Sequence, residues 1–262
     1  MIEGYGPSTY GDRFADVYDD WYGHASDTAA TVERVAALAT AVAGRGPVLE
    51  LGGGSGRLVL PLAERGLDTW TIDASLAMVR RLRAKAGGPG VHTVVADMAA
   101  LPLAGGPRFA VVLCAFNTLF NLTTAEDQRR CVREAAERLV PGGGRFVVEA
   151  FVPPTADRDG LGLDDRSDAV SAVEPRHIGL DEVVLTVSRL DPATHLITGQ
   201  HLQITEGGIR LRPWVLRYLA PGELDALAEE AGLRLVERHG GWRGEAFTAD
   251  SSVHVSTYAP VH

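Results

Sequence analysis

The pattern of apolar positions predicts helices at the start of the chain. Aromatic and acidic residues recur at roughly helical spacing over residues 12–22. In the segment that follows, Val32, Val35, Leu38 and Val42 fall on one face of a helix. We therefore expect two helices before residue 44.

From residue 47 onward, short apolar runs alternate with helical periods. Runs such as FAVVLCAF are apolar almost throughout, as in strands that are covered on both faces. This alternation predicts a Rossmann-like, doubly wound α/β fold with a mostly parallel seven-stranded sheet. The predicted strands are 47–51, 68–72, 92–96, 109–115 and 145–151, and the predicted helices are 56–65, 75–86 and 124–139.

The pattern changes after Val152. Residues 153–175 are rich in Asp, Pro and Gly and are interpreted as a loop. Three strand-like runs follow up to Leu219, separated by DPAT and EGG, and predict an antiparallel β meander that is inserted in the sheet or added to it. A helix with Pro221 at its start and Gly232 at its end precedes two last strands.

Composition narrows the classes of function. The 262 residues are 45% hydrophobic and 23% charged, with a net charge of −9, which disfavours nucleic-acid binding and favours a small-molecule partner. No window resembles a membrane span or a signal peptide, so we expect a cytoplasmic protein. Cys114 and Cys131 have no Cys or His at metal-ligand spacing, which predicts buried reduced thiols and no metal site. Basic residues other than Lys85 are all Arg, a composition typical of GC-rich bacterial genomes.

A glycine-dense turn lies between the first predicted strand and its helix. Such a turn lets a ligand approach the backbone and the free N–H groups of the helix. A P-loop would need a lysine here, and the dinucleotide fingerprint would need glycine where Arg57 stands. What remains is an acidic-x-Gly-x-Gly-x-Gly turn, Glu50 to Gly56, followed by Asp73 at the end of the next strand. A carboxylate at that place accepts hydrogen bonds from ribose hydroxyls.

Four segments in order, VLELGGGSG, TIDASLAM, VVADMAALPL and LVPGGGRFVVEAF, resemble the motifs of the class I S-adenosylmethionine-dependent methyltransferases. The resemblance extends over most of the chain. It implies S-adenosylmethionine as the cofactor, S-adenosylhomocysteine as the product, and no metal. It also implies lid helices (1–44), a cofactor-binding core (45–152), an inserted loop and meander on the acceptor side (153–219), and a closing helix with the last two core strands (220–262).

The resemblance assigns cofactor contacts to individual residues. Gly52 and Gly54 border the methionine and ribose parts, Asp73 binds both ribose hydroxyls, and Ala74 and Met78 lie beside the adenine. Asp97 accepts from the adenine amino group and Met98 donates its backbone N–H, although Asp97 would also serve as a turn cap. The remaining expected contacts are Glu50, Arg57, Phe116 and the lid residues Tyr10, Tyr18 and Tyr22, whose aromatic cluster would equally dock a helix.

The acceptor is expected at the end of the fourth strand, CAFNTLFNL. The segments that mark base-methylating enzymes and metal-dependent catechol enzymes are absent there. The layout is closest to methyltransferases that act on amines of small molecules, sugars or peptides in antibiotic pathways. Some of these carry a His where this chain has Asn121, so N- and O-methylation both stay open.

Candidate acceptor-side residues follow from this placement. A hydroxyl acceptor would need a base, and the candidates are Glu149, His177, His201 and His239, beside Asn121. Substrate contacts are expected from Asn117, His201, Trp214, Trp242 and Arg243. The alternatives are a non-catalytic S-adenosylmethionine-binding regulator and a nicotinamide dehydrogenase, the latter disfavoured by Arg57 and by the lack of a Tyr-x-x-x-Lys pair. Exposed edges of the meander offer a surface for a homodimer.

Overall fold

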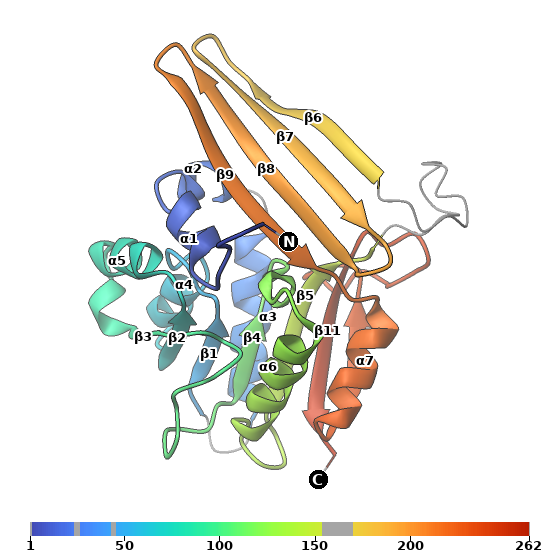
Figure 1. Cartoon of the computed structure of the whole chain (residues 1–262). Coiled ribbons are helices and arrows are strands. Elements are labelled where there is room, and N and C mark those ends of the chain that lie inside the picture. The colour runs from blue at the N-terminus through green and yellow to red at the C-terminus, as the bar shows by residue number, and fades with distance from the viewer. Residues whose placement is uncertain (1, 24–26, 43–45, 154–169, 262) are drawn as a thin grey trace.

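The computed structural model describes residues 2–23, 27–42, 46–153 and 170–261, which form two sheets (Figure 1). The larger sheet has seven strands in the order β10-β11-β5-β4-β1-β2-β3. Its first five strands in chain order pair in parallel, and β11 is antiparallel to both β5 and β10. The predicted doubly wound, mostly parallel sheet is confirmed. The strands are β1 (Val48–Leu51), β2 (Thr69–Asp73), β3 (His92–Val95), β4 (Val111–Cys114), β5 (Arg145–Phe151), β10 (Leu233–His239) and β11 (Val253–Pro260).

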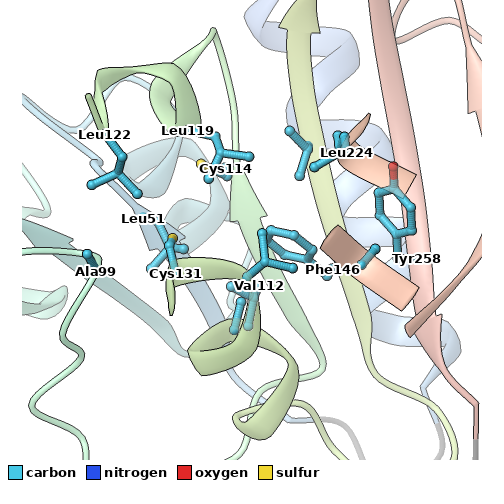
Figure 2. Close-up of a cluster of buried hydrophobic side chains, with 14 of the residues drawn as sticks. Leu51, Ala99, Val112, Cys114, Leu119, Leu122, Cys131, Phe146, Leu224 and Tyr258 are labelled. Atoms are coloured by element: carbon cyan, nitrogen blue, oxygen red, sulfur yellow. The ribbon is translucent and has the colours of Figure 1, made fainter. Parts of the chain in front are cut away.

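Helices cover both faces of this sheet. One core cluster joins the sheet to α6 and α7, and another joins it to α3 and α4. Figure 2 shows the first cluster, in which Cys114 and Cys131 lie among Leu51, Val112 and Phe146. Both cysteines are buried. The helices are α3 (Thr28–Ala41), α4 (Val59–Glu64), α5 (Leu76–Ala84), α6 (Ala125–Glu137) and α7 (Pro221–Glu230), with short 3-10 turns η1 (Gly88–Gly90) and η2 (Thr118–Asn121).

The N-terminal segment departs from the prediction. Residues 12–22 were expected to form one helix, but the structure has α1 (Thr9–Phe14) and α2 (Tyr18–Tyr22) with a bend between them. The Asp16 carboxylate lies at this bend and accepts a hydrogen bond of 2.6 Å from Arg212. A long-range ion pair therefore anchors the bend, and helical periodicity alone gave no sign of it.

The meander forms a separate antiparallel sheet that stands out from the core above α1 and α2 (Figure 1). Its strands are β6 (Val170–Ile178), β7 (Glu182–Asp191), β8 (Leu196–Thr205) and β9 (Gly208–Arg217). Sequence predicted three strands and a loop over 153–175; residues 170–175 belong to β6, and 154–169 lie outside the described residues. Pro175 and the adjacent register shift obscured the alternation, and an edge strand tolerates both. Within the described residues, we found no helix with the length and apolarity needed to cross a membrane.

Candidate active site

A cavity of about 390 Å³ lies at the carboxyl ends of the parallel strands, beneath α1, α2 and the small sheet. Parallel α/β sheets bind ligands at this edge, and the volume suits a small molecule. The cavity brings together most of the residues that the sequence singled out. They are Tyr10, Tyr18, Tyr22, Gly52, Gly54, Asp73, Ala74, Met78, Asp97, Met98, Phe116, Asn117, Asn121, His201 and Trp214.

The glycine turn forms part of the cavity floor. Gly54 has φ +55°, and the nearest atom to a side chain placed there would be the Met78 sulfur at 3.9 Å, so its cavity side is open. At Gly53, by contrast, a Cβ would meet the Thr71 hydroxyl at 2.1 Å. The turn therefore needs glycine for two reasons, because Gly54 leaves room for a ligand whereas Gly53 allows close packing on β2.

Two carboxylates frame the middle of the cavity. Asp73, at the end of β2, accepts from the backbone N–H of Gly54 at 2.9 Å and of Ser75 at 2.8 Å. Burial raises the pKa of Asp73, and these two hydrogen bonds oppose the rise. Asp97 follows β3 and accepts from the Ala99 N–H at 2.9 Å, so it does cap its turn while it lines the cavity.

Aromatic residues of α1 and α2 form the roof. Tyr10 stacks on Phe14 with ring centroids 4.4 Å apart, and Tyr22 meets the Phe116 ring edge to face at 6.0 Å. Burial, together with neighbouring Tyr22, raises the pKa of Tyr10 well above its ordinary value. The cluster thus docks these helices and lines the cavity at once, so the two readings of the sequence are compatible.

Glu50 and Arg57 lie beside the cavity rather than on its wall. Glu50 is 5% exposed, and its Oε2 has no hydrogen-bond partner among the described residues. Burial raises the pKa of Glu50 to about 7, while the Arg57 guanidinium and the Val59 N–H oppose the rise. Arg57 lies 5.1 Å from the Phe116 ring centroid and donates to Thr28 at 3.3 Å.

A left-handed turn follows β4. Phe116 and Asn117 have φ +52° and +63°, a conformation that costs a residue other than glycine about 1–2 kcal/mol. The Glu149 carboxylate accepts from the Phe116 N–H at 2.7 Å, and Asn117 Oδ1 accepts from the Phe151 N–H at 2.7 Å. The carboxylate of Glu149, a residue predicted as a candidate base, therefore holds this turn in place through a hydrogen bond. It does not line the main cavity.

The small sheet supplies the far wall. His201 is 6% exposed, its Nδ1 lies 2.9 Å from the Thr186 hydroxyl, and Trp214 stands beside it with ring centroids 5.9 Å apart. Burial lowers the pKa of His201 to about 4, with help from the Arg176 and Arg212 guanidinium groups. The imidazole is therefore neutral at physiological pH. Asn121 also lines the cavity and donates to the Thr118 carbonyl at 3.4 Å.

Five predicted acceptor-side residues lie elsewhere. Trp242, Arg243 and Glu149 line a second cavity of about 270 Å³, which shares Phe116 and Asn117 with the first. Arg243 there donates to Asp27 at 2.7 Å. His177 is exposed on β6, and His239 lies beside Glu237 on β10; neither side chain lines either cavity.

Several cavity residues escaped the sequence reasoning. Tyr5, Thr118, Asp127 and Leu216 line the main cavity. Thr118 adjoins the predicted Asn117, and Leu216 lies two residues from the predicted Trp214. Lys85, the only lysine of the chain, pairs with Asp19 of α2 at 2.9 Å and donates to the Ser55 carbonyl. Among the described residues, no group of three or more His, Cys, Asp or Glu side chains could hold a metal ion.

Comparison with known proteins points in one direction. Residues 48–143 match the family model of a methyltransferase domain. The structure of the CcbJ methyltransferase from Streptomyces caelestis is 38% identical, with a TM-score of 0.83 over 98% of this chain and 100% of that one. Cypemycin N-terminal methyltransferase from a Streptomyces species is 29% identical over 78% of this chain and 79% of its own length.

A more distant structure shares the fold. It is a methyltransferase from Micromonospora echinaspora, described as an S-adenosylmethionine-bound amino pentose methyltransferase involved in calicheamicin biosynthesis. It is 23% identical, with a TM-score of 0.63 over 92% of this chain and 96% of that one.

Proposed function

Because the chain belongs to the class I S-adenosylmethionine-dependent methyltransferases, we propose that it methylates an amine of a small molecule or peptide in bacterial specialised metabolism. One observation carries the proposal: a single cavity joins the glycine turn and Asp73 to an aromatic wall with a neutral imidazole. The related cypemycin enzyme is named for methylation of an N-terminus, which favours an amine acceptor. The cavity continues past the turn to His201 and Trp214, so the acceptor side is not filled, as it would be in a non-catalytic binding protein.

The residues present fit the cofactor. Asp73 holds the ribose hydroxyls, Asp97 and Met98 the adenine, and the open side of Gly54 leaves room for the chain between them. Buried Glu50, with its unpartnered oxygen, is suited to the methionine ammonium. Arg57, beside Glu50 and Tyr18, is suited to the methionine carboxylate. The helices α1 and α2 act as a lid over this half of the cavity.

Little acid–base chemistry is required of the protein. Bound S-adenosylmethionine supplies an electrophilic methyl group on a sulfonium. A neutral amine would attack the methyl carbon through its lone pair as the carbon–sulfur bond breaks, leaving S-adenosylhomocysteine and an N-methyl ammonium that loses its proton to solvent. Holding the reacting atoms in line is worth roughly 7–11 kcal/mol of the barrier. Phe116, Asn121, Trp214 and Leu216 form walls that hold the acceptor and exclude water. Neutral His201 orients the acceptor without placing a second cation beside the sulfonium.

Calorimetric titration with S-adenosylhomocysteine tests the cofactor half of the proposal. We expect wild-type protein to bind it, NADH to give no heat, and Asp73→Asn to lose at least tenfold in affinity, because hydrogen bonds to charged groups are worth about 1.5–3 kcal/mol each. Asp68→Asn, an exposed carboxylate just before the same strand, serves as the matched control and should bind like wild type.

Acceptor chemistry is tested separately by mass spectrometry. Matched amines and alcohols on the same carbon skeletons are incubated with enzyme and S-adenosylmethionine. We expect methyl transfer to amines only. Transfer to the alcohols alone would replace the proposal with O-methylation, and folded protein that binds neither adenosyl ligand would contradict the cofactor assignment.

A further inference from the structure

The imidazole of His201 is enclosed by aromatic rings at the far wall of the main cavity. The rings of Phe14, Trp21 and Trp214 stand around it, with centroids 5.6, 5.8 and 5.9 Å from its own. His201 is 6% exposed, and the space that it borders is the cavity. A Trp ring offers only an N–H donor, and a Phe ring has no polar atom. The surrounding rings therefore supply no hydrogen-bond acceptor to the imidazole.

Thr186 is the one hydrogen-bond partner of this imidazole within the part of the chain that the structure describes. The two residues are directly opposed on β7 and β8, and the Thr186 hydroxyl oxygen lies 2.9 Å from His201 Nδ1. The same hydroxyl makes no second hydrogen bond to a described residue. Its proton therefore finds an acceptor in the protein only when Thr186 donates to Nδ1.

This hydrogen bond decides which ring nitrogen carries the proton. In a neutral imidazole one nitrogen donates and the other accepts, and the partner of one nitrogen fixes the state of the other. With Nδ1 accepting from Thr186, Nε2 carries the proton. Nε2 has no partner among the described residues, and a buried N–H without an acceptor is costly. A molecule in the cavity is needed to supply that acceptor.

We propose that His201 donates its Nε2–H to an oxygen of the methyl acceptor, and that Thr186 is the positioning residue that keeps the proton on Nε2. The inference rests on the proposed amine acceptor and narrows it to amines with a carbonyl or hydroxyl oxygen on the neighbouring carbon. The oxygen and the amine lie close together because the far wall is close to the roof. Phe14 packs against His201 and also stacks on Tyr10, which covers the cofactor half of the cavity.

Two classes of molecule present this chemistry. The first residue of a peptide carries a carbonyl beside its amine, and an amino sugar carries a hydroxyl there. The opposite tautomer would leave a lone pair on Nε2, which would accept an N–H from any primary or secondary amine. The position of one proton therefore separates selection for an oxygen beside the amine from acceptance of amines in general.

Nitrogen NMR of the purified full chain reads the tautomer before any ligand is added. Protonated and unprotonated ring nitrogens of ¹⁵N-labelled histidine differ in shift, and His201→Phe identifies the His201 signals among those of the eight histidines. We expect a proton on Nε2 in wild type and in Thr186→Ser, which keeps the hydroxyl. Thr186→Val should give a mixture of tautomers. Thr198→Val, on the opposite face of β8, is the matched control and should leave the His201 signals unchanged.

Four probe amines test the acceptor class by NMR titration of protein saturated with S-adenosylhomocysteine. Alaninamide is matched with isopropylamine, and trans-2-aminocyclohexanol with cyclohexylamine. We expect an oxygen-bearing probe to shift the His201 Nε2–H signal and to bind about fivefold more tightly than its oxygen-free match, as one hydrogen bond allows. The difference should vanish in His201→Phe. The pair that responds tells a peptide-like carbonyl from a sugar-like hydroxyl.

An unprotonated Nε2 in wild type would overturn the inference, and so would equal binding, or no binding, within both pairs of probes. Calorimetry with S-adenosylhomocysteine keeps the two proposals apart. Protein that does not bind it would contradict the proposed cofactor, whereas the tautomer of the ligand-free protein would still decide the role of Thr186.

Discussion

Two ionisable side chains near the cavity have pKa values far from their ordinary ones. Burial keeps His201 neutral and raises the pKa of Glu50 to about 7, so a single carboxylate close to the glycine turn titrates near physiological pH. Both shifts have the same origin, since a buried charge loses its hydration. The charge beside the glycine turn therefore depends on pH through Glu50.

Affinity for S-adenosylhomocysteine should therefore fall as the pH drops from about 8 to about 6. In the proposed binding mode, Glu50 is ionised above its pKa and attracts the ligand ammonium. Protonation below the pKa removes that attraction and lowers the affinity by up to about tenfold per pH unit. Calorimetry across this range should show the decline in wild type. Glu50→Gln should bind more weakly at the upper end and show a flat profile, whereas a decline that persists in this variant would contradict the contact.

Substitution of Glu149 distinguishes a clamp from a catalytic base. Glu149→Gln keeps an oxygen for the Phe116 N–H and should retain activity within a few-fold. Glu149→Leu leaves that N–H unpaired in a left-handed turn and should cost about 1–3 kcal/mol of unfolding free energy, with a raised KM for S-adenosylmethionine. If Glu149 were the base, the Gln variant would itself lose about 10²–10⁴ in kcat. Steady-state kinetics and denaturant titration measure both quantities.

Among the secondary-structure elements, α1 and α2 are joined to the core and to the small sheet by polar contacts. Asp12 accepts from Ser75 at 2.6 Å, and Asp19 pairs with Lys85 at 2.9 Å and with Ser55. Burial acts to raise the pKa of Asp19, but Ser55 and Lys85 outweigh it and lower that pKa. The contacts with Ser75 and Ser55 join the roof helices to the segment after Asp73 and to the glycine turn.

Loosening this roof should speed ligand release. Asp19→Asn removes the charge that Lys85 meets, and because both side chains are about one-third exposed the loss is modest, about 0.5–1 kcal/mol. We expect S-adenosylhomocysteine to dissociate about two- to five-fold faster in stopped-flow measurements, with a smaller difference at high salt. Asp20→Asn, one residue further along the same helix and exposed, should dissociate at the wild-type rate.

The fold class and the residues at the glycine turn were predicted correctly because they depend on patterns that are short in sequence. Glu50, Gly54 and Asp73 lie within two successive strand ends, and parallel pairing necessarily brings those ends to one edge of the sheet. Apolar runs likewise mark strands covered on both faces, as the fully buried β1 and β4 are. Local spacing was therefore enough to predict the class of fold and the residues that gather at the glycine turn.

Tertiary structure decided the acceptor side, because a strand residue faces a cavity or solvent according to long-range register. His177 and His201 both lie in the meander, yet only His201 faces the cavity, since β8 is central and β6 is an edge strand. The same register turned Leu185, Leu202 and Leu211 outward, and the ion pair between Asp16 and Arg212 accompanies the break in the N-terminal helix. The sequence by itself determined the fold class and the glycine turn. The choice of side chains that form the far wall of the cavity depended on contacts between segments far apart in the chain. Asp16 and Arg212, for example, are separated by 196 residues.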